Sequence, residues 1–128
     1  MKTLLTLVAA LVLVAAAHAA QFPDISITEL KSAIETKKVV LLDVNGTTSY
    51  QSGHIPGALD YTAVKQDLAK VLPKDKNALV VAYCGGPACG AYQAAAKAAK
   101  DLGYKNVKHL VAGISGWKEA KETLEKAN

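Results

Sequence analysis

The sequence predicts an α/β protein with an open, mainly parallel sheet whose two faces are covered by helices. Three short apolar runs, at residues 39–44, 77–83 and 106–112, are separated by longer segments in which apolar residues recur at helical spacing. Near-continuous apolar runs are typical of parallel strands that are buried on both faces. Because helical segments separate the strands, the strands can run parallel and the chain can form one layered domain.

The first half of the predicted domain contains a helix and two strands. Ser26 and Glu29 have the spacing of a capping box, and apolar residues at helical spacing follow, so we expect a helix to about Thr36. The run 39–44 is then the first buried strand. The segment TTSYQSGHIPGALD indicates a short helical turn, a glycine–proline break and a brief strand at 58–60.

The second half alternates helices with two further strands. Apolar residues at helical spacing stop at Pro73, which predicts a helix that ends there, and a buried strand follows. An alanine-rich helix is expected over 90–102, with Gly103 at its C-terminal end. The run 106–112 predicts the next strand, and residues 115–127 the last helix.

The N-terminus has the pattern of a secretory signal peptide. Lys2 precedes an apolar run that ends in an A-x-A cleavage pattern. The run is shorter than the roughly 18 residues that a membrane-spanning helix needs. We therefore expect residues 1–19 to be a signal peptide, with cleavage after Ala19 or Ala20. Residues 21–128 are then a single domain that is exported to a bacterial periplasm, without stable membrane insertion after cleavage.

The charge pattern argues against nucleic-acid binding and against one class of enzyme. The formal net charge is +4, and all 15 basic residues are lysines scattered along the chain. Nucleic-acid-binding proteins instead gather basic residues on one face.

Phosphatases with a C-x5-R loop need an arginine that binds phosphate in a bidentate manner. The chain has no arginine, and Gly90 stands at that position, so phosphatase chemistry of this type is excluded.

The two cysteines of the chain, Cys84 and Cys89, lie on one glycine-rich loop between a predicted strand and a predicted helix. Ligands of open parallel sheets bind at this position, beyond the carboxyl ends of the strands. Small side chains let successive backbone N–H groups form a nest that suits an anion or a reactive thiolate. The residues of this candidate binding loop are Gly85, Gly86, Pro87, Ala88, Cys89 and Gly90. Two cysteines without nearby histidine or carboxylate ligands make an incomplete metal site, and no cofactor is expected.

Three segments, in this order, resemble motifs of the rhodanese family of sulfurtransferases: LLDV followed by YQSGHIPGA, then YCGGPACG, then HLVAGISGWKEA. The resemblance covers nearly all of the chain after the predicted signal peptide. It implies an open, mainly parallel five-stranded sheet and a Cys84 nucleophile that accepts a sulfane sulfur as a persulfide. It also implies that backbone N–H groups of Gly85 to Gly90 stabilise the persulfide, and that Asp43 and His54 are supporting residues.

The chain departs from the family pattern where an anionic donor would bind. Asn45 stands where the family commonly has arginine, and the loop has Gly-Gly-Pro-Ala where the family often has a cation. A loop cation holds a dianion such as thiosulfate through charge-assisted hydrogen bonds, so a lysine from elsewhere would have to replace it. The neutral loop favours a small persulfide, a polysulfide or a protein persulfide over thiosulfate as the donor. The expected acceptor is a thiol or a cyanide-like compound.

Cys89 has three interpretations, because two cysteines on one loop in an oxidising compartment can form a disulfide. It can be a resolving cysteine that attacks the Cys84 persulfide, releases sulfide and leaves a disulfide for a thioredoxin-like partner to reduce. It can exchange disulfides without any sulfur transfer, or it can be an inert thiol. For the whole protein, the alternative to a sulfurtransferase is a non-catalytic module that binds a partner protein with its Cys84–Cys89 bridge closed.

Overall fold

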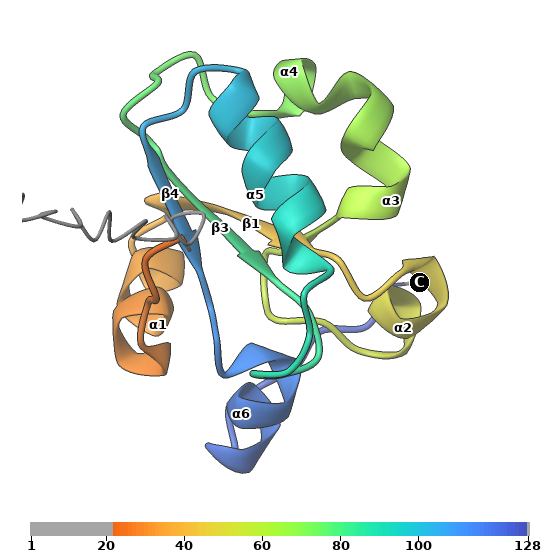
Figure 1. Cartoon of the computed structure of the whole chain (residues 1–128). Coiled ribbons are helices and arrows are strands. Elements are labelled where there is room, and N and C mark those ends of the chain that lie inside the picture. Colours follow the sequence, from red (N-terminus) through yellow and green to blue (C-terminus); the bar gives the residue numbers. More distant parts are fainter. Residues whose placement is uncertain (1–21, 128) are drawn as a thin grey trace, which may run out of the picture.

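The computed structural model describes residues 22–127, which form a twisted sheet between two sets of helices (Figure 1). The predicted signal peptide, residues 1–19, lies outside the described residues. No helix within the described part of the chain is long and apolar enough to cross a membrane. In chain order the elements are α1 (Ile27–Glu35), β1 (Val39–Asp43), α2 (Thr47–Ser52), β2 (Leu59–Asp60), α3 (Tyr61–Val64), the 3-10 helix η1 (Lys65–Asp67), α4 (Leu68–Val71), β3 (Leu79–Tyr83), α5 (Tyr92–Asp101), β4 (Asn106–His109) and α6 (Gly113–Glu119).

The strands form one open, all-parallel sheet in the order β2-β1-β3-β4, which confirms the predicted α/β class. The two central strands, β1 and β3, pair along their full length, from Val39 with Leu79 to Asp43 with Tyr83. Because all strands point the same way, the segments that follow them meet at one edge of the sheet. This edge carries the cysteine loop.

The sheet of the described residues has four strands, where the resemblance implied five. Beyond β4, a single parallel bridge joins Asp24 to His109. The N–H of Ile25 donates to the His109 carbonyl at 3.0 Å, and the N–H of His109 donates to the Pro23 carbonyl at 2.8 Å. Pro23 has no N–H of its own to extend the pairing. Ser26 already caps α1, so the chain leaves the sheet after one residue pair.

Each face of the sheet carries its own apolar core, because successive residues of a strand point to opposite faces. Val80 and Ala82 of β3 lie in the first core, together with buried residues of α4 and α5. Val81 and Tyr83 lie in the second core, which also contains residues of α1 and Trp117 of α6. Figure 1 shows the same division, with α1 and α6 on one side of the sheet and α3, α4 and α5 on the other. The predicted helix cover on both faces is therefore confirmed.

Some element boundaries differ from the sequence-based expectation. The single helix expected before Pro73 is divided into α3, η1 and α4. The strand expected over 106–112 ends at His109, because the next residues turn into α6. The helix expected over 90–102 begins at Tyr92, which leaves Gly90 in the loop.

The C-terminal segment is not helical, in contrast to the helix expected as far as residue 127. After α6, the indole N–H of Trp117 donates to the carbonyl of Thr123 at 2.8 Å. Glu125 then forms an antiparallel bridge with His54, with backbone hydrogen bonds of 2.8 and 2.9 Å. The backbone of Glu125 thus forms its hydrogen bonds with His54, in a loop distant in sequence, and the segment is extended.

Candidate functional site

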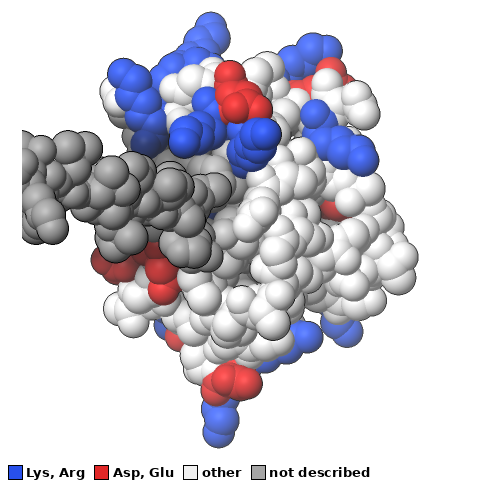
Figure 2. Space-filling view, viewed as in Figure 1, with Lys and Arg blue, Asp and Glu red and all other residues white. Residues whose placement is uncertain are grey.

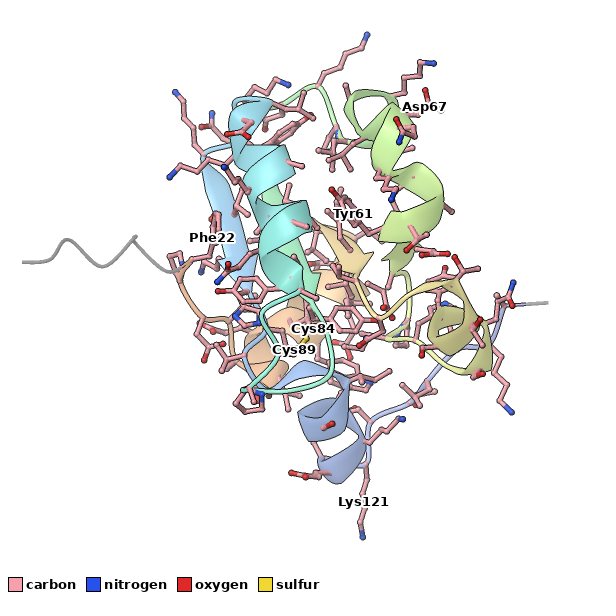
Figure 3. The ribbon with its side chains drawn as sticks, turned by 45° about the vertical axis from the view of Figure 1, so that its right-hand side comes forward. Phe22, Tyr61, Asp67, Cys84, Cys89 and Lys121 are labelled. Atoms are coloured by element: carbon pink, nitrogen blue, oxygen red, sulfur yellow. A yellow bond between two sulfur atoms is a disulfide. The ribbon has the colours of Figure 1, made fainter. Side chains whose placement is uncertain are left out.

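Cys84 lies directly after β3, at the carboxyl end of a central strand. Its side chain belongs to the first core, and the residue is only 1% exposed. The chain then passes through a loop, residues 84–90, towards α5 (Figure 3). Within this loop Pro87 and Ala88 are exposed, whereas Cys89 is half-buried. The two sulfur positions of the loop therefore differ in their access to other molecules.

Cys84 and Cys89 form a disulfide, with their Cα atoms 6.3 Å apart (Figure 3). No cysteine within the described residues is free. The N–H of Cys89 donates to the Gly86 carbonyl at 3.0 Å, so the residues between the cysteines form a tight turn. The turn brings the two sulfurs into the contact that resolving chemistry and disulfide exchange both require.

The start of α6 holds the first part of the loop in place. The N–H of Ile114 donates to the Cys84 carbonyl at 3.0 Å, and the N–H of Ser115 donates to the Gly85 carbonyl at 2.9 Å. Gly113 has a φ of +62°, and a Cβ at this position would lie 2.6 Å from the carbonyl carbon of Gly85. Glycine is therefore needed here both for its left-handed backbone and for the close approach of α6 to the loop.

The backbone N–H groups of the loop are of two kinds. The N–H of Cys89 is used within the turn. The N–H groups of Gly85, Gly86, Ala88 and Gly90 donate to no acceptor within residues 22–127. Unpaired amides on a tight loop can stabilise negative charge. Four of the residues over which the nest is predicted thus have an N–H without an acceptor in the described part of the chain, whereas the N–H of Cys89 is occupied and Pro87 has none.

Asp43 is buried at the end of β1 and holds the next turn in place. Its Oδ1 accepts the N–H of Asn45 at 2.8 Å, and its Oδ2 accepts the hydroxyl of Tyr83 at 2.6 Å. The same hydroxyl accepts the N–H of Ile55 at 3.0 Å. Burial, together with the hydrogen bond to Asp43, raises the pKa of Tyr83 well above its usual range, so the hydroxyl stays protonated. Tyr83 was not predictable as a site residue from the sequence, because a tyrosine at the end of a strand belongs to no distinctive motif.

His54 is buried between α2 and the C-terminal segment. Its Nδ1 lies 2.8 Å from the Tyr50 carbonyl, and its ring stacks on the Tyr50 ring with the centroids 3.8 Å apart. Its Nε2 lies 3.7 Å from the Glu125 carboxylate, and the two backbones pair as well. These contacts attach the end of the chain to the turn that follows α2.

A cavity of about 280 Å³ lies between α2 and α6. Ile114, which bonds to the Cys84 carbonyl, forms part of its wall. Asn45 also lines it, and the Asn45 Oδ1 is 4.0 Å from where a Cβ on Gly85 would lie. The other lining residues are Thr48, Ser49, Ser52, Gly53, Lys118 and Leu124. A positive charge that the loop itself lacks is therefore present in the neighbouring cavity, at Lys118.

Charged side chains are unevenly distributed over the surface. Figure 2 shows lysines gathered over the C-terminal end of α5 and the adjoining loops, whereas the surface over the N-terminal end of α5 is uncharged in this view. The cysteine loop precedes that N-terminal end.

Within residues 22–127, no group of three or more histidine, cysteine, aspartate or glutamate residues is placed to hold a metal ion.

The chain is similar in sequence and in fold to several known proteins. Residues 26–120 match the family model described as a rhodanese-like domain. The thiosulfate sulfurtransferase GlpE of Coxiella burnetii is 30% identical over 98 residues, which cover 76% of this chain and 88% of that protein. An HTH-type transcriptional regulator of Mycobacterium tuberculosis is 38% identical over 112 residues, or 85% of this chain, but the chain spans only 48% of the regulator. The BH2092 protein of Bacillus halodurans superimposes with a TM-score of 0.68 and 28% identity, covering 81% of this chain and 77% of that one.

Proposed function

The chain belongs to the rhodanese-like domain family, and from this premise we propose that it is a sulfurtransferase in which Cys84 carries the sulfur. In the reduced protein, the Cys84 thiolate attacks the outer sulfur of a donor persulfide, R–S–SH. A sulfur–sulfur bond forms at Cys84, the bond between the two donor sulfurs breaks, and the carrier leaves as RS⁻. An acceptor thiolate then attacks the outer sulfur of the Cys84 persulfide, takes it over and restores the Cys84 thiolate.

The observation that carries this proposal is the place of Cys84 in the fold. It lies at the carboxyl end of a central parallel strand, at the start of a loop in which four backbone N–H groups have no acceptor within the described residues. Such amides stabilise a thiolate or persulfide anion without a charged side chain. The small residues of the loop place little side-chain bulk around these amides, which supports a role of the backbone in binding the transferred sulfur.

The oxidised loop has to be reduced before this cycle can begin. A dithiol reductant supplies the two electrons. One of its thiolates attacks the Cys89 sulfur, Cys84 leaves as a thiolate, and the second thiol of the reductant displaces Cys89 and closes the reductant's own disulfide. We expect the attack at Cys89 because it is half-buried, whereas Cys84 is only 1% exposed.

We also propose that Cys89 is a resolving cysteine. The Cys89 thiolate attacks the inner sulfur of the Cys84 persulfide, HS⁻ leaves, and the Cys84–Cys89 bond is restored. The outer sulfur thereby departs as sulfide, and the dithiol reductant opens the loop for the next cycle. The disulfide supports this role because it brings the two sulfurs into bonding contact.

The disulfide also favours a second candidate function. If the bridge stays closed, the protein is a thiol–disulfide exchange protein or a partner-binding rhodanese-like module, without sulfur transfer. In this case a dithiol protein is the partner, and it reacts at the exposed turn of Pro87 and Ala88 beside Cys89.

The N-terminal pattern supports a location outside the cytoplasm for either function. A basic residue, a short apolar run and an A-x-A site suit export across the inner membrane to a bacterial periplasm. In such an oxidising compartment a disulfide on the loop persists until a dedicated reductant opens it. The partners are then a small sulfur donor, a thiol or cyanide-like acceptor, and a thioredoxin-like dithiol protein.

Intact-mass analysis tests the proposed function. The protein is reduced, freed of reductant and incubated with N-acetylcysteine persulfide, polysulfide or thiosulfate. We expect one added sulfur atom, mapped to Cys84 by peptide mass, with the persulfide or polysulfide. Cys84→Ser should abolish this uptake, whereas the matched control Cys89→Ser should take up the sulfur and retain it for longer, because it cannot release sulfide.

Two results would change the assignment. Uptake that survives in Cys84→Ser would show that another group carries the sulfur. No uptake from any donor, together with rapid reopening of the Cys84–Cys89 bond by a dithiol protein, would assign the redox function instead.

A further inference from the structure

We propose that the cavity between α2 and α6 binds the carrier part of an anionic, low-molecular-weight persulfide, with Lys118 binding its carboxylate. This inference rests on the proposed function and names the substrate class of the same site. In this arrangement the neutral loop binds the sulfur that reacts, and the cavity binds the charged carboxylate of the donor molecule.

Two residues of the cavity wall contact the first residues of the cysteine loop, although no residue of the loop itself lines the cavity. Ile114, on its wall, donates its N–H to the carbonyl of Cys84 at 3.0 Å. Asn45, also on its wall, follows the β1 strand end and approaches Gly85. A molecule in the cavity is therefore separated from the first two residues of the loop by the two wall residues Ile114 and Asn45.

Lys118 provides the electrostatic complement to a carboxylate. It lies one helical turn after Ile114 on α6, so both residues face the same side of the helix. Among the residues that line the cavity it is the charged one, and it forms no ion pair within the described part of the chain. Its ammonium group is therefore available to a ligand, with no acidic side chain on the cavity wall to oppose an anion.

Asn45 offers a second donor to the same ligand. Its Nδ2 is buried and has no hydrogen-bond partner among residues 22–127. A buried amide without a partner is uncommon and needs an explanation. A carboxylate oxygen in the cavity would accept from it, while the hydroxyls of Thr48 and Ser49 on the α2 side add further polar contacts.

The size and polarity of the cavity limit the ligand. About 280 Å³ is slightly below the range of roughly 300–1,000 Å³ that is usual for drug-sized ligands. It suits a carrier of about the size of a cysteine derivative. An inorganic donor such as thiosulfate has no separate carrier part with which to reach Lys118, so the cavity would give it no advantage.

The first test compares two donors that differ only in charge. We measure kcat/KM for sulfur loading of reduced protein by N-acetylcysteine persulfide and by its uncharged carboxamide. Lys118→Gln should lower the value for the carboxylate donor about 10-fold, the effect of losing one charge-assisted hydrogen bond, and leave the carboxamide unchanged. Lys118→Arg should keep most of the activity. Equal losses with both donors, or no loss with either, would overturn the inference.

Lys121 supplies the matched control. It follows the same helix but points away from the cysteine pair (Figure 3), and it does not line the cavity. Lys121→Gln removes the same charge from the protein as a whole, so it should leave both donors unaffected. A loss in Lys121→Gln as large as in Lys118→Gln would mean that the overall charge acts, and not the cavity.

A binding experiment keeps the inference separate from the proposed function. The variant Cys84→Ser/Cys89→Ser cannot transfer sulfur, and it is titrated with N-acetyl-S-methylcysteine, a stable anionic thioether, while NMR follows the Asn45 side-chain amide. We expect this signal to shift and the shift to weaken in the Lys118→Gln background. If the amide does not respond, the cavity site is wrong even where Cys84 loads sulfur; if it responds but Cys84 takes up no sulfur, only the proposed function fails.

Discussion

Replacing Gly113 with alanine should destabilise the protein through the contact between α6 and the cysteine loop. An alanine Cβ would lie 2.6 Å from the carbonyl carbon of Gly85 and 2.6 Å from the nitrogen of Gly86. The left-handed backbone costs a non-glycine residue about 1–2 kcal/mol. Relief of the overlap by a backbone shift costs about 1–3 kcal/mol more. We therefore expect Gly113→Ala to lower the free energy of unfolding by about 2–5 kcal/mol.

The variant Gly57→Ala measures the cost of the left-handed backbone without the cost of an overlap with neighbouring atoms. The φ of Gly57 is +81°, but no atom lies within 4 Å of a Cβ built on it, so Gly57→Ala should cost only the backbone strain of about 1–2 kcal/mol. Urea unfolding of both reduced variants, followed by the fluorescence of Trp117, measures the difference at equal m-values. Equal losses in the two variants would refute the close contact of α6 with the loop. The backbone shift that relieves the overlap in Gly113→Ala moves Gly85 and Gly86, the residues next to Cys84. Gly113→Ala should therefore also slow sulfur loading, whereas Gly57→Ala should not.

Three further predictions concern stability. Tyr83→Phe leaves the Oδ2 of buried Asp43 and the buried N–H of Ile55 without a partner, so it should lower the free energy of unfolding in urea by about 2–4 kcal/mol. Reducing the Cys84–Cys89 bond opens a short loop and should cost about 2 kcal/mol, a loss that Cys89→Ser should reproduce without reductant. Burial lowers the pKa of His109 in the folded state, because the neutral imidazole is favoured there. The free energy of unfolding in urea should therefore fall as the pH drops below about 6.5, where His109 of the unfolded chain becomes protonated. His109→Gln should remove this part of the pH dependence, and an unchanged pH profile would contradict it.

The sequence by itself determined the class of the fold and the order of its elements. The capping box at Ser26 and Glu29 is complete in the structure, and the apolar runs became parallel strands, because these signals depend on neighbours a few residues away. The sequence also placed both cysteines on the loop after a strand. In a parallel sheet that position lies at the carboxyl edge, whatever the details of packing.

The tertiary structure decided which distant residues meet at that edge. Lys118 and Asn45 lie far apart in the sequence, and only the packing of α6 beside α2 places them on one cavity. Glu125 lies in a segment with helical spacing, but its backbone pairs with His54, so the chain there is extended. Local patterns predict local hydrogen bonds, whereas long-range contacts replace those bonds where a distant partner offers a better one. For this reason the loop was predictable from the sequence, and the positive charge beside it was not.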